Sequence, residues 1–238
     1  MSSAFTALQD QFTSQAAEGP LASVKKKAWE RFALVGLPTK DQDAFRYLPL
    51  REFAQSTFTF PGSLFIQKEA ITHAIFPECR HSHVVFVDGS LCLELSDLTA
   101  LPPQTSFLSL EEGMRTHSQF LQQGFARSLK EEEDPFALLN LALHPKGAFF
   151  YVPPQVCIET PIQCLYVSTS DWPQVIAPRL QIACGRHSQV RFLMTAFAVE
   201  PNTAHLLLPY TEVSLEEGSS VAIYNTANAL PFAWHFET

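Results

Sequence analysis

From Gly147 to the last residue, the sequence consists of short β-rich runs broken by proline or glycine, and one pattern within them recurs. Each copy has two alternating apolar residues, a turn-forming residue three places after the second, and then another alternating run. The copies are Val156-x-Ile158-x-x-Pro161, Leu180-x-Ile182-x-x-Gly185 and Val213-x-Leu215-x-x-Gly218. Proline and glycine suit corners, where a strand ends and no ladder N–H is needed. Because stacked repeats bury their inward residues against one another, the pattern predicts a β-solenoid.

An ordinary antiparallel sandwich is the alternative fold for this region. It would place short hairpin turns between adjacent runs. The connections "SDWPQVIAP" and "EPNTAHLLLP" are longer than such turns, which favours the solenoid.

The preceding part of the chain carries helical periodicity and two local signals. Apolar residues recur at helical spacing in two stretches, which are Phe5, Leu8 and Phe12, then Val24, Ala28, Phe32 and Val35. Gly36 and Pro38 predict the end of the second helix. Asp88-Gly89, between the apolar runs of "VVFVDGSLCLEL", predicts a β-hairpin. Asp134 as N-cap and Pro135 at the first helical position predict another helix, with Phe136, Leu139 and Leu143 on its buried face.

Charge and hydropathy exclude several classes of protein. The chain has 16 Lys and Arg residues against 24 Asp and Glu residues, a formal net charge of −8, so we expect no nucleic-acid partner. No window approaches the roughly 18 apolar residues of a membrane helix, and the N-terminus lacks the features of a signal peptide. We therefore expect a cytoplasmic protein with no membrane contact.

The five cysteines form no CxxC motif, which argues against a disulfide framework and a zinc ribbon. Cys157 and Cys164 flank Pro161 too far apart for CxxC redox chemistry, and we interpret Cys164 as a small core residue. Cys184 and His187 flank Gly185, where both could face solvent.

One metal site is suggested by the stretch "CRHSH". Cys79, His81 and His83 alternate, so an extended strand would place all three on one face, roughly 6 to 7 Å apart. A metal-dependent enzyme centred on these residues is therefore one hypothesis. Side chains along a single strand seldom converge on one ion, so we expect no bound metal and keep the three residues as candidates only.

No catalytic constellation emerges from the remaining residues. The GxSxG, HExxH, P-loop and GxGxxG motifs are all missing. A solenoid hydrolase would need carboxylates on neighbouring coils about 5 to 9 Å apart. Glu159 and Glu216-Glu217 follow the strands of the first and third copies, but Ala183-Cys184 occupies that place in the second. A solenoid carbohydrate-active or carbohydrate-binding protein is the alternative function; we expect no catalytic residue.

Four stretches resemble one known family. They are "AWERFALVGLPTKDQDAFRYLPLREF", "DPFALLNLALHPKGAFFYVPPQVCIETPIQCLYV", "APRLQIACGRHSQVRFLMT" and "EVSLEEGSSVAIYN", and they resemble the SufB/SufD family of iron–sulfur cluster assembly proteins. The N-terminal helix with "GLPT" is similar to SufD rather than SufB. Together they cover 93 of the 238 residues, about two fifths of the chain. Phe45 departs from the family, which usually has Trp there.

The resemblance implies a mainly β fold, with a right-handed parallel β-helix (solenoid) core preceded by an N-terminal helical and α+β region. We expect a helical region over residues 1–60, an α+β region with the hairpin and a helix over 61–145, and the β-helix core over 146–238.

The resemblance also implies a non-catalytic scaffold subunit of the SufBCD complex. In that family SufD pairs with SufB through the β-helix, and the SufC ATPase hydrolyses ATP. The iron–sulfur cluster, and the reduced flavin associated with the complex, would belong to the assembly. The sequence has no flavin motif, so we expect no cofactor bound by this chain alone.

Family members extend well beyond this length and close with helices that dock SufC. This chain stops at "FAWHFET" in strand-like sequence. We therefore expect a piece of a longer protein, with the SufC-docking helices and the late functional histidine of the family outside it. An uncapped final coil exposes strand edges, which predicts pairing with a second copy into a homodimer.

Overall fold

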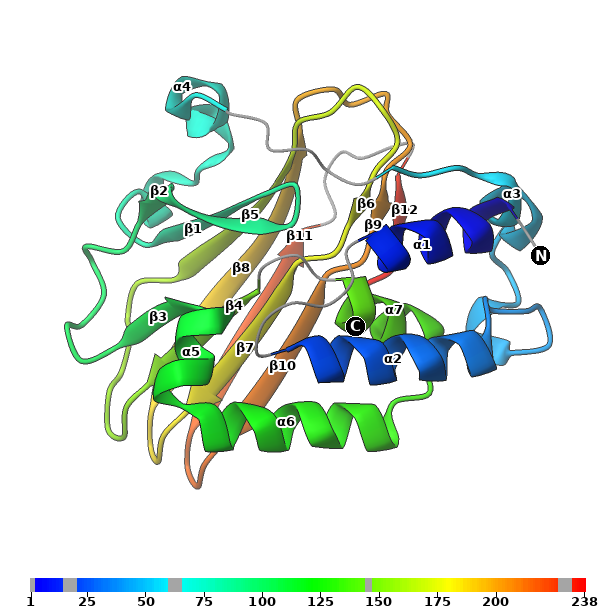
Figure 1. The fold of residues 1–238 in the computed structure, drawn as a ribbon. Coiled ribbons are helices and arrows are strands. Elements are labelled where there is room, and N and C mark those ends of the chain that lie inside the picture. Colours follow the sequence, from blue (N-terminus) through cyan, green and yellow to red (C-terminus); the bar gives the residue numbers. More distant parts are fainter. Residues whose placement is uncertain (1–2, 15–20, 60–65, 144–146, 227–232) are drawn as a thin grey trace.

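The computed structural model describes residues 3–14, 21–59, 66–143, 147–226 and 233–238, and all structural statements below concern these ranges. The described strands form three sheets, and most of the helices lie on one side of them (Figure 1). The α-helices are α1 (Ser3–Ser14), α2 (Ala22–Val35), α3 (Leu50–Gln55), α4 (Lys68–Ile71), α5 (Leu110–Thr116), α6 (Ser118–Glu131) and α7 (Pro135–Leu143). Three short 3₁₀-helices span Asp43–Phe45, Thr72–Ala74 and Pro77–Cys79.

The strands fall into three sheets. The first has the order β11 (Ser220–Thr226), β8 (Gln189–Ala198), β5 (Ile162–Ser168), β1 (His83–Val87) and β2 (Ser90–Asp97). The second has the order β10 (Tyr210–Leu215), β7 (Arg179–Cys184), β4 (Ala148–Val152) and β3 (Ser106–Ser109). The third is short, with β12 (Trp234–His235), β9 (Leu206–Leu207) and β6 (Val175–Ile176).

The expected mainly β fold with a right-handed parallel β-helix was wrong. The described ranges form a mixed α/β structure, with seven α-helices interleaved with twelve strands. Two of the sheets are mixed, because β1–β2 and β3–β4 pair antiparallel whereas β1–β5, β5–β8 and β4–β7 pair parallel. The repeat pattern could not exclude a mixed fold, because it describes alternation within single strands, whereas the partner and direction of each strand depend on contacts between distant residues.

The expected repeat also has the wrong register. Ile182 lies opposite Val213, and Cys184 lies opposite Leu215, so the second and third copies are offset by two positions from the sequence alignment. The other neighbour of Ile182 is Phe150 of β4 rather than Ile158. Because side chains alternate with a period of two, a shift of two residues preserves the apolar pattern and cannot be detected from it.

The N-terminal helices pack through aromatic rings. The ring of Phe12 stacks on that of Trp29 with centroids 4.8 Å apart, and the ring of Phe5 stacks on that of Phe32 at 5.8 Å. The predicted helix end is confirmed, because Gly36 has φ +75° and its N–H donates to Phe32 O at 2.7 Å. Val35, which we expected on the buried stripe, is 42% exposed.

The predicted hairpin is confirmed. Val87 pairs with Ser90 across the turn, and Asp88 and Gly89 have φ values of 47° and 82°. Both central residues thus have positive φ, as a type I′ turn requires. The Asp88 carboxylate also accepts hydrogen bonds from the Thr169 N–H at 2.9 Å and the Thr169 hydroxyl at 2.6 Å. The hairpin is thereby tied to the loop after β5.

The predicted cap of α7 is also confirmed. Asp134 Oδ1 accepts from the N–H groups of Phe136 at 2.7 Å and Ala137 at 3.4 Å. All nine residues of α7 are buried, rather than one face of the helix. Helix α7 lies between α2 and the third sheet. The free backbone N–H groups at its N-terminus must therefore find hydrogen-bond acceptors within the protein.

We expect Asp134→Ala to lower the free energy of unfolding by about 1 kcal/mol, because it leaves two helix N–H groups without their acceptor. Urea denaturation monitored by circular dichroism measures this change. Glu133→Ala is the matched control, since Glu133 is exposed and its carboxylate caps no helix N–H in the described residues. Equal stability of the Asp134→Ala variant and the wild-type protein would contradict the capping role.

Two hydrophobic clusters share the second sheet. Leu180 and Ile182 of β7 face a cluster enclosed between the first two sheets, together with Phe150 and Phe192. Phe149 and Ala183 face the opposite way, into the cluster beneath the helices. The second sheet therefore separates the interior between the first two sheets from the layer of helices.

Candidate functional site

The three candidate metal ligands do not come together. Cys79 ends a 3₁₀-helix and is buried, whereas His81 follows in a turn and is exposed, so the expected single strand was wrong. His83 begins β1, and its Nδ1 and Nε2 lie 3.0 Å from Cys79 O and 3.2 Å from Leu95 O. Among the described residues, no three His, Cys, Asp or Glu side chains are grouped as metal ligands. Pro77, at the first position of the 3₁₀-helix, was the signal that could have predicted a turn here.

His81 instead pairs with Asp97. Its Nδ1 lies 3.1 Å from Asp97 Oδ2, while Asp97 Oδ1 accepts from the hydroxyl and the N–H of Thr99. The Thr99 hydrogen bonds, with a smaller contribution from His81, lower the pKa of Asp97 to about 2. This pair closes a surface loop and leaves Asp97 ionised at neutral pH.

The buried cysteines are unreactive thiols. Cys164 lies in the cluster between the sheets, as we expected, and burial raises its pKa to about 12. Cys184 is also buried, so its expected solvent exposure was wrong, and burial raises its pKa to about 11. His187 is exposed. A thiol with a raised pKa is a poor nucleophile and a poor metal ligand at neutral pH.

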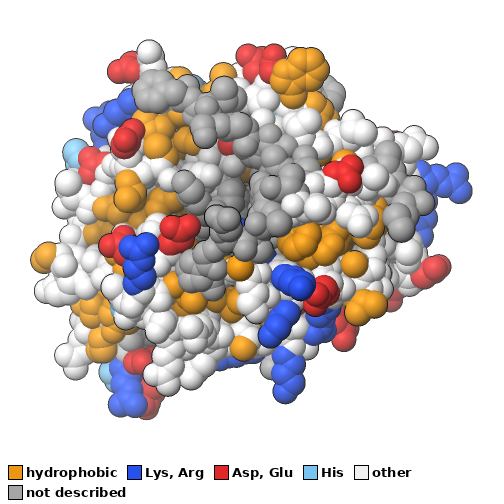
Figure 2. Space-filling model, in the orientation of Figure 1, with side chains coloured by type: hydrophobic (Ala, Val, Ile, Leu, Met, Phe, Trp, Pro, Cys, Tyr) orange, Lys and Arg blue, Asp and Glu red, His pale blue; other side chains and the backbone are white. Residues whose placement is uncertain are grey.

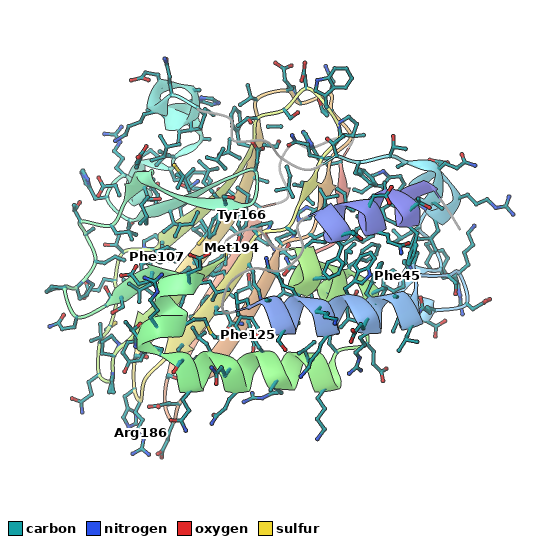
Figure 3. All side chains as sticks on the ribbon, viewed as in Figure 1. Phe45, Phe107, Phe125, Tyr166, Arg186 and Met194 are labelled. Carbon is teal, nitrogen blue, oxygen red and sulfur yellow. The ribbon has the colours of Figure 1, made fainter. Side chains whose placement is uncertain are left out.

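A buried arginine organises the face of the second sheet beneath the helices. Arg179 has no solvent exposure, and its Nη1 and Nη2 donate to Asn140 Oδ1 at 3.1 Å and Glu212 Oε2 at 3.3 Å. Its Cζ lies 3.9 Å from the ring centroid of Tyr210 and 5.4 Å from that of Phe125, which is labelled in Figure 3. Burial lowers the pKa of the guanidinium, and Tyr210 and Glu212 act in the opposite direction. We call Arg179, Glu212, Asn140 and Gln181 the arginine cluster.

The arginine cluster connects α7 to two strands. Asn140 Nδ2 donates to Pro178 O at 3.0 Å and to Leu208 O at 2.6 Å, just before β7 and β10. Gln181 Nε2 donates to Glu212 Oε2 at 2.9 Å. The cluster could not be predicted from the sequence, because its members lie far apart in the chain and a lone arginine in a strand carries no sequence signal of burial. The cluster is a structural tie, since buried charges are maintained only where they are paired.

A second cluster of buried polar side chains lies between the first and third sheets. Tyr166 and Cys164 of β5 face the interior between the sheets, and alternation places Ser168 on that side too. His205 is fully buried, and its Nδ1 accepts the Gln174 N–H at 3.3 Å. Among the described residues, His205 Nε2, Gln174 Oε1 and Ser168 Oγ have no hydrogen-bond partner. Protonation of His205 would place a positive charge at this buried position, where it would be poorly compensated.

We expect acid to destabilise the protein through His205. Burial lowers its pKa from 6.5, while Asp88 acts in the opposite direction. The unfolded chain therefore binds a proton that the folded protein excludes, so stability is complete above about pH 6.5 and decreases as the pH falls below that value. The pKa of His235 is also lowered by burial, which contributes with the same sign.

The measurement is the free energy of unfolding from about pH 7.5 to about pH 5 at fixed salt. His205→Gln should flatten this dependence, whereas His187→Gln, at an exposed position, should leave it unchanged. A wild-type slope that His205→Gln does not alter would contradict the assignment.

The strands β10, β11 and β12 each form the last strand of a sheet, and they lie at the same end of the structure (Figure 1). Several of their apolar side chains are exposed: Leu215 is 54%, Ile223 41% and Tyr224 54% exposed. At the start of β10, the Thr211 N–H donates to Thr238 O at 2.9 Å. We call β10, β11 and β12 the terminal edge. Edge strands present N–H and C=O groups that can pair with another chain.

The last residues belong to the core rather than to a separate binding cluster. The ring of Phe236 stacks on that of Phe136 with centroids 3.6 Å apart, and the ring of Trp234 meets that of Phe53 edge to face at 5.5 Å. Trp234 and His235 form β12, which agrees with the strand-like character of "FAWHFET" in the sequence.

The protein surface shows no single-sign charged face in the view of Figure 2, where acidic and basic side chains are interspersed among separate hydrophobic patches. None of the described helices is long and apolar enough to cross a membrane.

Comparison with known proteins identifies the family. The family model described as SufBD protein N-terminal region matches residues 3–164, which is more than half of the chain. The chain therefore belongs to the SufBD family, and the resemblance found in the sequence is confirmed.

Curated relatives extend the comparison. The chain is 23% identical over 183 residues to an iron-sulfur cluster assembly SufBD family protein of Synechocystis sp., covering 76% of this chain and 40% of the relative. It is 31% identical over 105 residues to the iron-sulfur cluster assembly protein SufD of Bacillus subtilis, covering 44% of this chain and 23% of that protein. The chain thus spans less than half the length of these relatives.

Proposed function

We propose that this chain is a non-catalytic scaffold subunit in iron–sulfur cluster assembly, acting in the cytoplasm within a SufBCD-type complex. The family match over residues 3–164 is the observation that supports it.

In this proposal, SufB pairs with the terminal edge. Three edge strands at one end, with exposed Leu215, Ile223 and Tyr224, offer both backbone groups and apolar surface to a partner. We assign the contact with SufC, the subunit that hydrolyses ATP, to the part of the relatives beyond the matched region. The iron–sulfur cluster and any reduced flavin are handled by the assembled complex.

Deletion of the gene in the source cells tests this function. We expect lower activity of iron–sulfur enzymes such as aconitase, with unchanged amounts of their polypeptides, and recovery when the wild-type gene is restored. Normal aconitase activity in the deleted strain, under iron limitation as well, would reject the proposal.

Without SufB, the terminal edge would pair with a second copy of the chain. Sedimentation velocity of the purified protein should then show a dimer that Ile223→Lys converts to monomer, since the new charge lies at the exposed edge. A wild-type protein that stays monomeric at all concentrations would reject this self-association.

A further inference from the structure

A groove lies between α6 and the second sheet, outside the terminal edge and the arginine cluster. Its volume is about 500 Å³, within the range of small-molecule sites. Gly124 of α6 lies close to the sheet, since a Cβ there would lie 3.2 Å from Glu212 Oε1. Towards the ends of the strands, the floor is made of the small residues Ala183, Gly185 and Ser214, so space remains under the helix.

One wall of the groove is aromatic. The ring of His117 lies 5.0 Å from that of Phe149 and 5.7 Å from that of Tyr151, and the Phe120 ring lies 5.9 Å from that of Phe149. All four rings line the groove. Flat aromatic walls above a floor of small side chains suit a planar ring, which stacks on or meets such rings edge to face.

The groove is also lined by one arginine side chain that has no partner among the described residues. Arg127 lines it, and in the described part of the chain its guanidinium has no hydrogen bond or ion pair. The nearby carboxylates are engaged: Glu216 accepts the Arg186 N–H at 3.0 Å, and Glu212 binds Arg179 and Gln181. An anionic group at Arg127 would therefore find a partner that no side chain of the protein supplies.

The spacing limits the size of a ligand. Phe120 and Arg127 are seven residues apart on α6, which corresponds to about 10 Å along the helix axis. A carboxylate attached to two fused rings has about this length. We propose that this groove binds a planar aromatic carboxylate, with its rings against His117, Phe120 and Tyr151 and its carboxylate at Arg127. The inference depends on the groove alone and not on the proposed assembly function.

Titration of the purified chain with 2-naphthoate, followed by calorimetry and by amide NMR, tests the proposal. We expect saturable binding with amide shifts concentrated at Phe120, Ala183 and Ser214. Naphthalene-2-carboxamide is the neutral counterpart, and it should bind roughly tenfold more weakly because it lacks the charge that meets Arg127.

Two variants make the test specific. Arg127→Gln should weaken naphthoate binding roughly tenfold and remove the preference for naphthoate over the carboxamide, whereas Arg186→Gln, on the loop after β7 (Figure 3), should change neither. Ser214→Leu should block the groove, with thermal unfolding to verify the fold. The proposal is overturned if naphthoate does not bind, if the shifts lie elsewhere, or if the two arginine variants bind equally.

Discussion

Replacing Arg179 with alanine should lower the free energy of unfolding by about 3 to 5 kcal/mol. Arg179 is completely buried, and its loss would leave Glu212 in a largely enclosed place without its cation, as well as Asn140 without one donor. The side chain of Glu212 is only 17% exposed, so water compensates little of the lost pairing. Equilibrium unfolding in urea measures the change.

A double variant separates pairing from packing. Arg179→Met with Glu212→Gln removes both charges and retains much of the volume, so it should be more stable than Arg179→Ala. Arg186→Ala is the matched control, because Arg186 is exposed and the expected change is within about 0.5 kcal/mol. A loss below about 1 kcal/mol in Arg179→Ala would show that the arginine cluster is not the tie described here.

Replacing Phe136 with alanine should destabilise the protein by a similar amount, about 3 to 5 kcal/mol. The Phe136 ring is 2% exposed and lies at the centre of an aromatic group, stacked on Phe236 at 3.6 Å and edge to face with Phe45 and Phe53. The substitution would open a cavity where the N-terminal helices, α7 and the last residues meet.

The control for Phe136 is Phe120→Ala. Phe120 is 38% exposed at the rim of the groove, so its truncation leaves no enclosed cavity and should cost much less. Thermal and urea unfolding of both variants provide the comparison. Similar stability of the two would mean that the last residues are not part of the core.

Features that depend on neighbouring residues were predictable from the sequence. The Asp88-Gly89 turn, the end of α2 at Gly36 and the Asp134 cap follow from backbone preferences that operate within a few residues. Each was confirmed because no distant contact opposes the local preference.

Features that depend on distant contacts were not predictable. Helix α6 contains Gly124, a poor helix former, at the point where a Cβ would crowd Glu212, so the reason for that glycine lies in another element. The offset of the repeat escaped detection because alternation looks the same after a shift of two residues. The arginine cluster, the buried polar residues around His205 and the groove each combine residues from separate elements.

We propose that the chain acts by binding SufB through the terminal edge. Capture of purified SufB by the tagged chain, in parallel with Ile223→Lys and with Leu93→Lys, tests it most directly. Leu93 is 55% exposed on β2, at the opposite edge of the same sheet, and therefore makes a matched control. We predict that the wild-type chain and Leu93→Lys retain SufB while Ile223→Lys loses it. Failure of the wild-type chain to retain SufB, or equal retention by all three, would contradict the account.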